Sequence, residues 1–288
     1  MGHLPVNNRL KIISEIIQKR EDLQEFLELQ RKILQVQLEV DDQSNKGVKS
    51  DWNFQLSVPF LEQKSLEAKK PIIHFLNLEI FDEDLLISMF RKVVKILIST
   101  HPDREGLSKF LEYIEAGKIC FMKLIEAALR EDETLIISCA EKIGVEPSLL
   151  IFLINTPIQP FIEEISRRAS PSFYNRWWRA NCPICGRMPR VARIRSRKRY
   201  LMCDFCGAEY LSDYVLCVNC GNKDPYTLKY LKIEGKPEFQ IDFCDKCKHY
   251  IKIIIEKKLG EPIPRCVEDM LTLDLDIEAK QAGLIRNG

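Results

Sequence analysis

Apolar residues in the first part of the chain recur three and four positions apart, with Lys, Arg, Glu and Gln between them. Leu10, Ile13 and Ile17 begin this pattern, which continues to about residue 170. Because one helical turn takes about 3.6 residues, the spacing gathers apolar side chains on one face of a helix. We expect helices over the first stretch up to Leu38 and then over 82–99, 105–129, 131–143 and 147–169.

Loops interrupt the pattern at two places. Asp, Asn, Ser and Gly cluster at 41–47, and Pro102 and Gly106 break the period at 100–106. The helices predict an all-α domain over residues 1–170, either a bundle or an irregular helical array.

The pattern changes at RRASPSFYNRWWRANC, residues 167–182. Short runs rich in Val, Ile, Tyr and Leu follow, which favours strands, and only 268–284 returns to a helical period, ending at Gly283 or beyond. The fold class expected is therefore α+β and multidomain. After the helical domain we expect two small modules over 171–212 and 213–262, and a C-terminal helix and tail over 263–288 that dock on one module.

Composition limits the functions that fit this architecture. Lys and Arg number 43 against 42 acidic residues, so the net charge of +1 predicts no bulk attraction to nucleic acid or anionic membrane. The N-terminal segment lacks a signal-peptide pattern, and no apolar run approaches the roughly 18 residues of a membrane span. We expect a soluble, cytoplasmic chain. Its 11 cysteines would then stay reduced, which favours metal or redox chemistry over disulfides.

Eight of the cysteines form four Cys-x-x-Cys pairs within 66 residues. Two such pairs supply four thiolates, the tetrahedral set that zinc and iron both accept. Glycine follows three of the pairs and allows a tight turn in which backbone N–H groups point at the sulfurs, whereas Lys248 follows the fourth. We expect two metal ions per chain, iron or zinc, held by Cys182, Cys185, Cys203, Cys206, Cys217, Cys220, Cys244 and Cys247.

The spacing favours pairing in the order of the sequence. That order leaves 17 residues between the halves of the first site and 23 between those of the second, lengths that suit two strands and a turn. An interleaved arrangement, in which Cys182/Cys185 and Cys217/Cys220 share one ion, stays open. So does a redox-active dithiol or metal, although four neighbouring copies favour structural metal. His249 could replace a thiolate, but eight thiolates suffice without it.

The remaining candidates for chemistry are few. Cys120 and Cys139 stand alone on helical stretches and are expected to be buried apolar residues, and no role is assigned to Cys266. No Ser/His/Asp set, paired-carboxylate signature or phosphate-binding glycine loop occurs, so we expect a protein that is not an enzyme.

A basic run separates the helical part from the second Cys-x-x-Cys pair. Nine basic residues and no acidic one lie between Arg176 and Cys203. On a straight strand the alternating arginines would share one face, although a turn near Ser196 would divide them. Because guanidinium groups suit carboxylates and phosphates, one hypothesis is an anionic ligand or client protein at Arg193, Arg195 and Arg199. The alternative is a solvated hairpin. Trp177 and Trp178 are candidates for core packing, for binding, or for one role each.

Five blocks in order resemble the FdhE family of formate dehydrogenase accessory proteins. They are CPICGRMP (182–189), RYLMCDFCGAEY (199–210), VLCVNCG (215–221), FCDKCKHYIKI (243–253) and VEDMLTLDLDIEAKQAG (267–283). Arg187 departs from the family pattern, which commonly has a small residue there. The resemblance implies a helical domain, two rubredoxin-like or zinc-ribbon-like four-cysteine modules, and iron bound by the matching cysteines.

The resemblance also implies a function. A member of this family is expected to act as a cytoplasmic, chaperone-like accessory protein that binds the immature catalytic subunit of respiratory formate dehydrogenase. In one version of this hypothesis the protein also binds the molybdenum or tungsten pterin guanine dinucleotide of its client, because the pyrophosphates of that cofactor suit several guanidinium groups. Two alternatives stay open: a redox protein with a four-cysteine iron site, and a nucleic-acid-binding zinc-ribbon protein.

Overall fold

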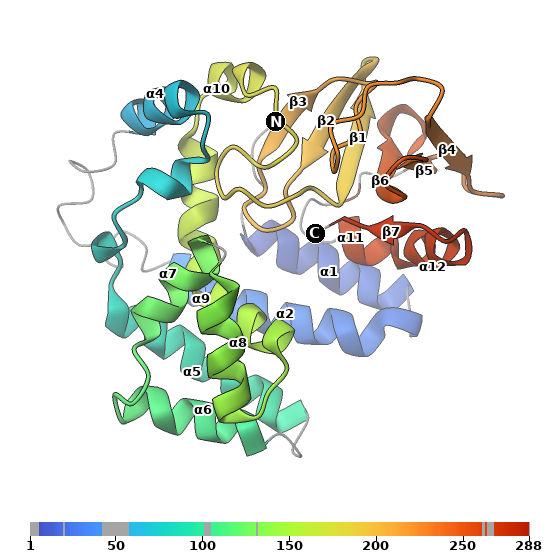
Figure 1. Ribbon diagram of the computed structural model, residues 1–288. Helices are drawn as coiled ribbons and strands as arrows, with labels where there is room; N and C mark the ends of the chain where they lie inside the picture. Colours follow the sequence, from blue (N-terminus) through green and yellow to red (C-terminus); the bar gives the residue numbers. More distant parts are fainter. Residues whose placement is uncertain are drawn as a thin grey trace. The chain divides into compact units, whose positions relative to one another are not determined.

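A computed structural model of the chain describes residues 6–19, 21–41, 58–100, 105–130, 132–260, 263 and 268–287 (Figure 1). These residues fall into two compact units. The helical unit lies within Pro5–Ser57 and Leu76–Ile162, and the sheet unit within Val58–Phe75 and Glu163–Gly288. The division falls inside a helix, near the boundary expected at residue 170. The four separate parts that the sequence suggests remain a prediction.

The helical unit confirms the all-α character expected of the N-terminal part. Phe90 lies at its centre, with ring centroids 5.0 Å from Phe110 and 4.8 Å from Phe121. The loops expected at 41–47 and 100–106 lie largely outside the described residues. The elements are α1 (Val6–Lys19), η1 (Glu21–Leu23), α2 (Gln24–Asp41), η3 (Leu78–Ile80), α5 (Glu83–Thr100), α6 (Glu105–Glu115), α7 (Phe121–Arg130), α8 (Glu133–Ile143) and the first part of α9 (Pro147–Arg168).

The prediction of one helix over 105–129 is wrong, because the chain turns between α6 and α7. Gly117 adopts a left-handed backbone with φ of 65°, and its N–H donates to the carbonyl of Ile114 over 3.0 Å. A glycine in this conformation satisfies the last carbonyls of a helix and redirects the chain. The apolar period continues through both helices, so periodicity alone does not reveal the turn.

A buried glutamine compensates for a proline inside α9. Pro160 has no backbone N–H, so the carbonyl of Thr156, four residues earlier, lacks its helical donor. Gln37 on α2 is 4% exposed, and its Nε2 donates to that carbonyl over 2.9 Å. One side chain therefore satisfies the orphaned backbone group and ties α2 to α9.

The sheet unit contains one mixed sheet with short helices around it. Its helices are α4 (Val58–Ala68), η2 (Ile72–Phe75), the end of α9, α10 (Pro171–Arg176), η4 (Glu256–Lys258), α11 (Glu268–Leu271) and α12 (Leu273–Gln281). Its strands are β1 (Val191–Arg195), β2 (Lys198–Met202), β3 (Glu209–Ser212), β4 (Leu228–Lys232), β5 (Phe239–Cys244), β6 (His249–Ile255) and β7 (Ile285–Arg286).

The two expected modules share this sheet. The strand order is β3-β2-β1-β6-β5-β4, and each half is antiparallel within itself. The halves meet where β1 pairs in parallel with β6, from Val191 opposite Lys252 to Ile194 opposite Ile255. Each half also repeats one sequence of parts: a cysteine turn, a strand, a second strand, a second cysteine turn and a third strand. The halves are therefore tandem copies of one topology.

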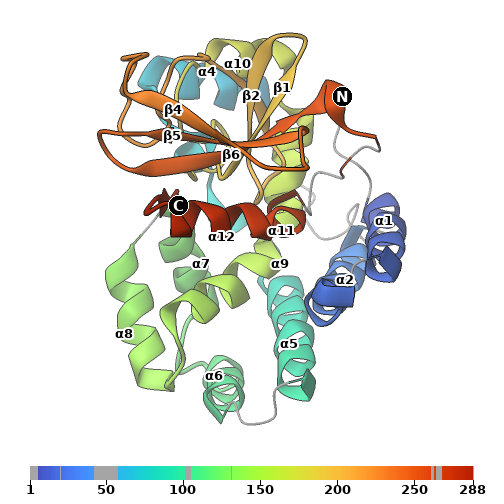
Figure 2. The ribbon, with the colours of Figure 1, turned by 90° about the vertical axis from the view of Figure 1, so that its right-hand side faces the viewer.

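The C-terminal segment docks on the second half of the sheet, as expected. Leu275 and Ala279 of α12 pack with Ile241 and Tyr250, and Figure 2 shows α11 and α12 along one face of the strands. The prediction of a single helix over 268–284 is wrong. The chain breaks at Thr272, whose hydroxyl donates back to the carbonyl of Glu268 over 2.7 Å and competes with helix continuation. Beyond it, β7 pairs with β6.

A fully buried lysine attaches these helices to the sheet. The Nζ of Lys252 lies 2.6 Å from Asp269 Oδ1 and 2.9 Å from Asp276 Oδ2, and Arg286 contacts both carboxylates from β7. Tyr250 donates its hydroxyl to Asp276 over 2.6 Å. Burial alone would raise the pKa of Asp269, but Lys252 and Arg286 outweigh it and hold the pKa below its usual value. The Asp269 carboxylate therefore stays ionised beside the buried ammonium group of Lys252.

Replacing Gln37 with Leu is expected to lower the free energy of unfolding by about 1 to 3 kcal/mol, because the Thr156 carbonyl is left buried without a donor. Chemical denaturation measures the change. Gln35→Leu is the matched control, since Gln35 is exposed on the same helix. Equal stability of the two variants would show that Gln37 does not compensate for the proline.

Replacing Lys252 with Met is expected to lower the free energy of unfolding by about 3 to 5 kcal/mol, because two partly buried carboxylates lose their shared cation. Lys280→Met provides the control, as Lys280 is exposed on α12. A loss of less than about 1 kcal/mol in denaturant titrations would mean that Arg286 alone neutralises the pair.

Candidate metal centres

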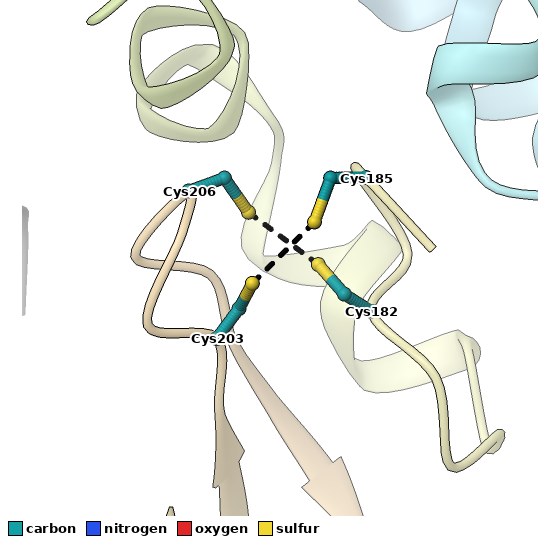
Figure 3. A group of neighbouring side chains, drawn as sticks. All are labelled: Cys182, Cys185, Cys203 and Cys206. Atoms are coloured by element: carbon teal, nitrogen blue, oxygen red, sulfur yellow. Dashed lines mark hydrogen bonds between the residues drawn. The ribbon is translucent and has the colours of Figure 1, made fainter. Parts of the chain in front are cut away.

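The first cysteine cluster comprises Cys182, Cys185, Cys203 and Cys206. The Sγ atoms all lie within 4.8 Å of one another, and Figure 3 shows them directed at a common centre. The Cys182–Cys206 and Cys185–Cys203 sulfur pairs are each 3.4 Å apart. A tetrahedral ion with metal–sulfur bonds of about 2.3 Å sets its sulfurs about 3.8 Å apart, so small outward shifts suffice for binding.

Tight backbone turns position these thiols. The N–H of Gly186 donates to the carbonyl of Cys182 over 3.0 Å, and Gly207 donates to Cys203 over 2.9 Å. Both glycines have φ above 60°, which places each pair of sulfurs on the inside of its turn. The first turn also binds η2, because Ile72 and Ile73 donate backbone N–H groups to the carbonyls of Pro183 and Ile184. The conformation of the first cysteine turn and that of η2, residues 72–75, therefore depend on each other.

The second cysteine cluster comprises Cys217, Cys220, Cys244 and Cys247. Its Sγ atoms also lie within 4.8 Å of one another, with Cys217–Cys247 at 3.5 Å and Cys220–Cys244 at 3.8 Å. Gly221 has φ of 71°, and Lys248 has φ of 61° at the equivalent place in the other turn. The lysine therefore adopts the glycine conformation, and the geometry of the turn persists despite the change in residue type.

The pairing of the Cys-x-x-Cys motifs in sequence order is confirmed, and the interleaved pairing is wrong for these clusters. The antiparallel hairpins explain the choice, because each brings the turn before its first strand beside the turn after its second. His249 is not part of the second cluster. Its Nδ1 lies 2.9 Å from the carbonyl oxygen of Cys247.

Hydrogen bonds to sulfur stabilise charge in the second cluster. Burial alone would raise the pKa of Cys244, but the N–H groups of Cys247 and Lys246 and the side-chain amide of Asn222 lower it to about 7. The Nδ2 of Asn222 lies 3.4 Å from that sulfur. The sequence analysis did not identify Asn222. The sequence signal that could have identified this residue is an asparagine directly after a Cys-x-x-Cys-Gly motif.

Electrostatics favours a cation in both clusters. Burial raises the pKa of Cys182 and Cys206 well above the usual thiol value, and it raises the pKa of Cys217 to about 12. Four adjacent thiolates therefore coexist only if a positive ion neutralises them. The all-sulfur donor set fits zinc and iron equally and disfavours magnesium or calcium.

The two clusters differ in access to solvent. All four cysteines of the first are buried, whereas Cys220 is exposed and Cys247 is partly exposed in the second. A bound ion would thus be more open to chelators and exchange at the second cluster.

The arginines of the hairpin have partners inside the sheet unit. Arg193 is 8% exposed and pairs with Glu268 and Glu256, and Arg195 pairs with Glu209. Arg199 is 3% exposed, and its Nη1 donates to the carbonyl of Leu216 over 2.9 Å. A two-residue turn at Ser196 and Arg197 divides the run, as expected. The hypothesis of an anionic ligand at these three residues stays a prediction.

Other candidates occupy different environments. Trp177 is buried, which fits core packing, whereas Trp178 is 55% exposed, and a binding role for it stays a prediction. Arg187, which departs from the family pattern, lies 3.5 Å from the ring centroid of Phe205. Cys139 is buried as expected. The same expectation is wrong for Cys120, which is exposed in the turn before α7. Cys266 lies outside the described residues.

No helix in the described part of the chain has the length and apolar character needed to cross a bilayer.

Two metal ions per chain are expected when the protein is isolated without oxygen, and elemental analysis measures them. The Cys182→Ser/Cys185→Ser and Cys217→Ser/Cys220→Ser variants should each lose one ion, while Cys139→Ser retains both. A chelator should remove the ion of the exposed second cluster first. Release from both clusters at one rate, or less than one ion in the unaltered chain, would contradict this description.

Comparisons with known proteins relate this chain to one family. Residues 215–288, which include the second cluster, match the family model described as FdhE, C-terminal domain. A curated protein FdhE homolog from Aquifex aeolicus (strain VF5) is 31% identical over 148 residues, covering 50% of this chain and 52% of that protein. The homolog from Haemophilus ducreyi is 31% identical over 117 residues, covering 38% and 37%. The homolog from Shewanella sp. (strain MR-4) is 32% identical over 106 residues, covering 35% and 34%.

The matched segment thus spans about half of the Aquifex relative and little more than a third of the other two. The crystal structure of the FdhE protein from Pseudomonas aeruginosa has the same fold, with a TM-score of 0.63 and 18% identity over 99% of this chain and 95% of that one. The C-terminal part of the chain thus matches the FdhE family model, the matched segments are similar to curated FdhE homologs, and the whole chain has the fold of an FdhE protein.

Proposed function

We propose that this chain is a non-catalytic accessory protein for the maturation of formate dehydrogenase and that it binds the immature catalytic subunit of that enzyme. The observation that carries the proposal is the occurrence of two four-cysteine clusters in one sheet within a chain whose C-terminal part matches the FdhE family model. In this function the metal ions are structural, and the client is a protein surface rather than a substrate that turns over.

The metal clusters support such a function by fixing a rigid surface. Each cluster joins two turns at the ends of a hairpin, and the β1–β6 pairing joins the two hairpins. Structural zinc contributes on the order of 10 kcal/mol to the folding of small modules, so loading both clusters would hold the sheet in one conformation. Residues on a rigid element keep their relative positions when a partner docks.

We place the client-binding surface at Trp178 rather than at the hairpin arginines. Trp178 is 55% exposed and has a left-handed backbone with φ of 46°, a conformation that is unfavourable for a bulky residue. It lines a hollow of about 400 Å³ with Lys69, Arg176 and Arg179. Trp and Arg carry much of the binding energy at protein interfaces. An exposed Trp among cations suits an acidic or aromatic segment of the client.

The client's pterin guanine dinucleotide remains a prediction from the sequence. The carboxylates beside Arg193 and Arg195 already neutralise these guanidinium groups. We therefore base the function on contact with the client protein and not on binding of its cofactor.

Replacing Trp178 with Ala is expected to weaken binding of the formate dehydrogenase catalytic subunit at least about tenfold, because a central aromatic contact is lost. Binding of the purified subunit to the metal-loaded chain measures the effect. Tyr226→Ala is the matched control, since Tyr226 is 89% exposed elsewhere on the sheet unit. If the unaltered chain does not bind the subunit, the proposed function is wrong; if both variants bind equally well, only the surface is wrong.

A further inference from the structure

A cavity of about 330 Å³ lies beside the second cysteine cluster. Its walls come from β4, β5 and β6 and from the segment that precedes Cys217. Side chains alternate between the faces of a strand, and on β5 Ile241 packs against α12 while Gln240 and Asp242 line the cavity. The cavity therefore occupies the sheet face opposite α12, and none of the roles described so far uses it.

Buried polar atoms without partners gather in this cavity. Asn287 is 1% exposed, and neither its Oδ1 nor its Nδ2 has a hydrogen-bond partner. Arg199 is 3% exposed, and its Nε also has none. In the described part of the chain five buried side-chain atoms lack a hydrogen-bond partner, although one of them, on Asp269, is in an ion pair, and three of the five belong to these two cavity-lining residues. Since such atoms are rarely left unsatisfied, their concentration here indicates a ligand site.

A carboxyl group completes the polar lining. Asp242 is partly buried, and Gln240 Nε2 donates to its Oδ1 over 2.6 Å. No ion pair joins Asp242 to Arg199, although their charges lie near enough to interact. The cavity thus offers an acceptor at Asp242, a donor at Arg199 Nε, and one of each at Asn287.

Flat and apolar surfaces form the remaining walls. Tyr214 and Tyr230 line the cavity with 51% and 57% of their surface exposed, and Val218 and Pro225 lie among its apolar residues. Exposed aromatic rings beside a polar interior suit a planar molecule, which can stack on one face and form hydrogen bonds along its edge. At about 30 Å³ per water, the volume matches about ten water-sized positions, the scale of one bicyclic ring system.

We propose that this cavity binds a small planar heterocycle with a lactam edge, in which an N–H donor lies next to a carbonyl acceptor, as in hypoxanthine and guanine. The carbonyl oxygen accepts from Arg199 Nε and Asn287 Nδ2, and the adjacent N–H donates to Asn287 Oδ1; where the ring carries a second N–H, as guanine does, that group donates to Asp242. This binding satisfies every unpartnered atom of the site at once. It goes beyond the proposed function and does not depend on a client protein.

The test uses inosine as the probe, because inosine has a lactam edge, and adenosine as the matched ligand that replaces the carbonyl with an amino group. Isothermal titration of the full metal-loaded chain should show saturable binding of one inosine, with adenosine at least about tenfold weaker. No saturable binding up to about 5 mM inosine, or equal binding of the two nucleosides, would overturn the proposal.

Substitutions locate the site. Asn287→Leu should weaken inosine binding at least about tenfold, since it removes both amide atoms. Asn155→Leu should leave binding unchanged, because Asn155 is likewise buried with an unpartnered Oδ1 but lies in the helical unit. Tyr230→Ala, at an exposed ring, provides a second variant if Asn287→Leu does not fold. Full inosine affinity in both cavity variants would show that the nucleoside binds elsewhere.

Discussion

Four thiolates that lie within 4.8 Å of one another in a buried position repel each other strongly, and the order of the sheet unit depends on how that repulsion is neutralised. A tetrahedral cation converts the repulsion into four bonds, and each bond then holds a backbone turn in place. The hairpins, the docking of η2 on the first turn and the shape of the cavity beside the second turn all depend on those turns. Where the clusters bind their ions, metal binding and folding of this unit are therefore coupled.

The parallel pairing of β1 with β6 extends this dependence from each cluster to the whole sheet. Either half alone would be a three-stranded sheet with little core, which is marginal in water. The pairing of β1 with β6 joins the halves into one larger sheet with these two strands at its centre. Lys252 on β6 then binds α11 and α12 through Asp269 and Asp276. The charged lysine is tolerated because two carboxylates and backbone carbonyls surround it.

Residue spacing predicted much of this structure. The cysteine spacing predicted both clusters and their pairing, because short connections leave a hairpin few alternatives. The helical period predicted most helices, but not the turn at Gly117 or the break at Thr272, since both interrupt the backbone without changing the apolar pattern. The β1–β6 pairing and the partners of Arg193 and Arg199 depend on contacts between residues far apart in the sequence. A run of basic residues looks exposed in sequence when its carboxylates come from other segments.

Because the two halves are tandem copies placed side by side, the sheet has two different edge strands. These are β3 at one end and β4 at the other. The helix α10 packs on β3 at one end, whereas β4 at the other contacts chiefly β5. Lys229 and Lys232 lie on β4, and lysines on a terminal strand oppose its pairing with another chain. The lysines thus protect β4, as α10 protects β3, from pairing with strands of other chains, which would extend the sheet into a fibre.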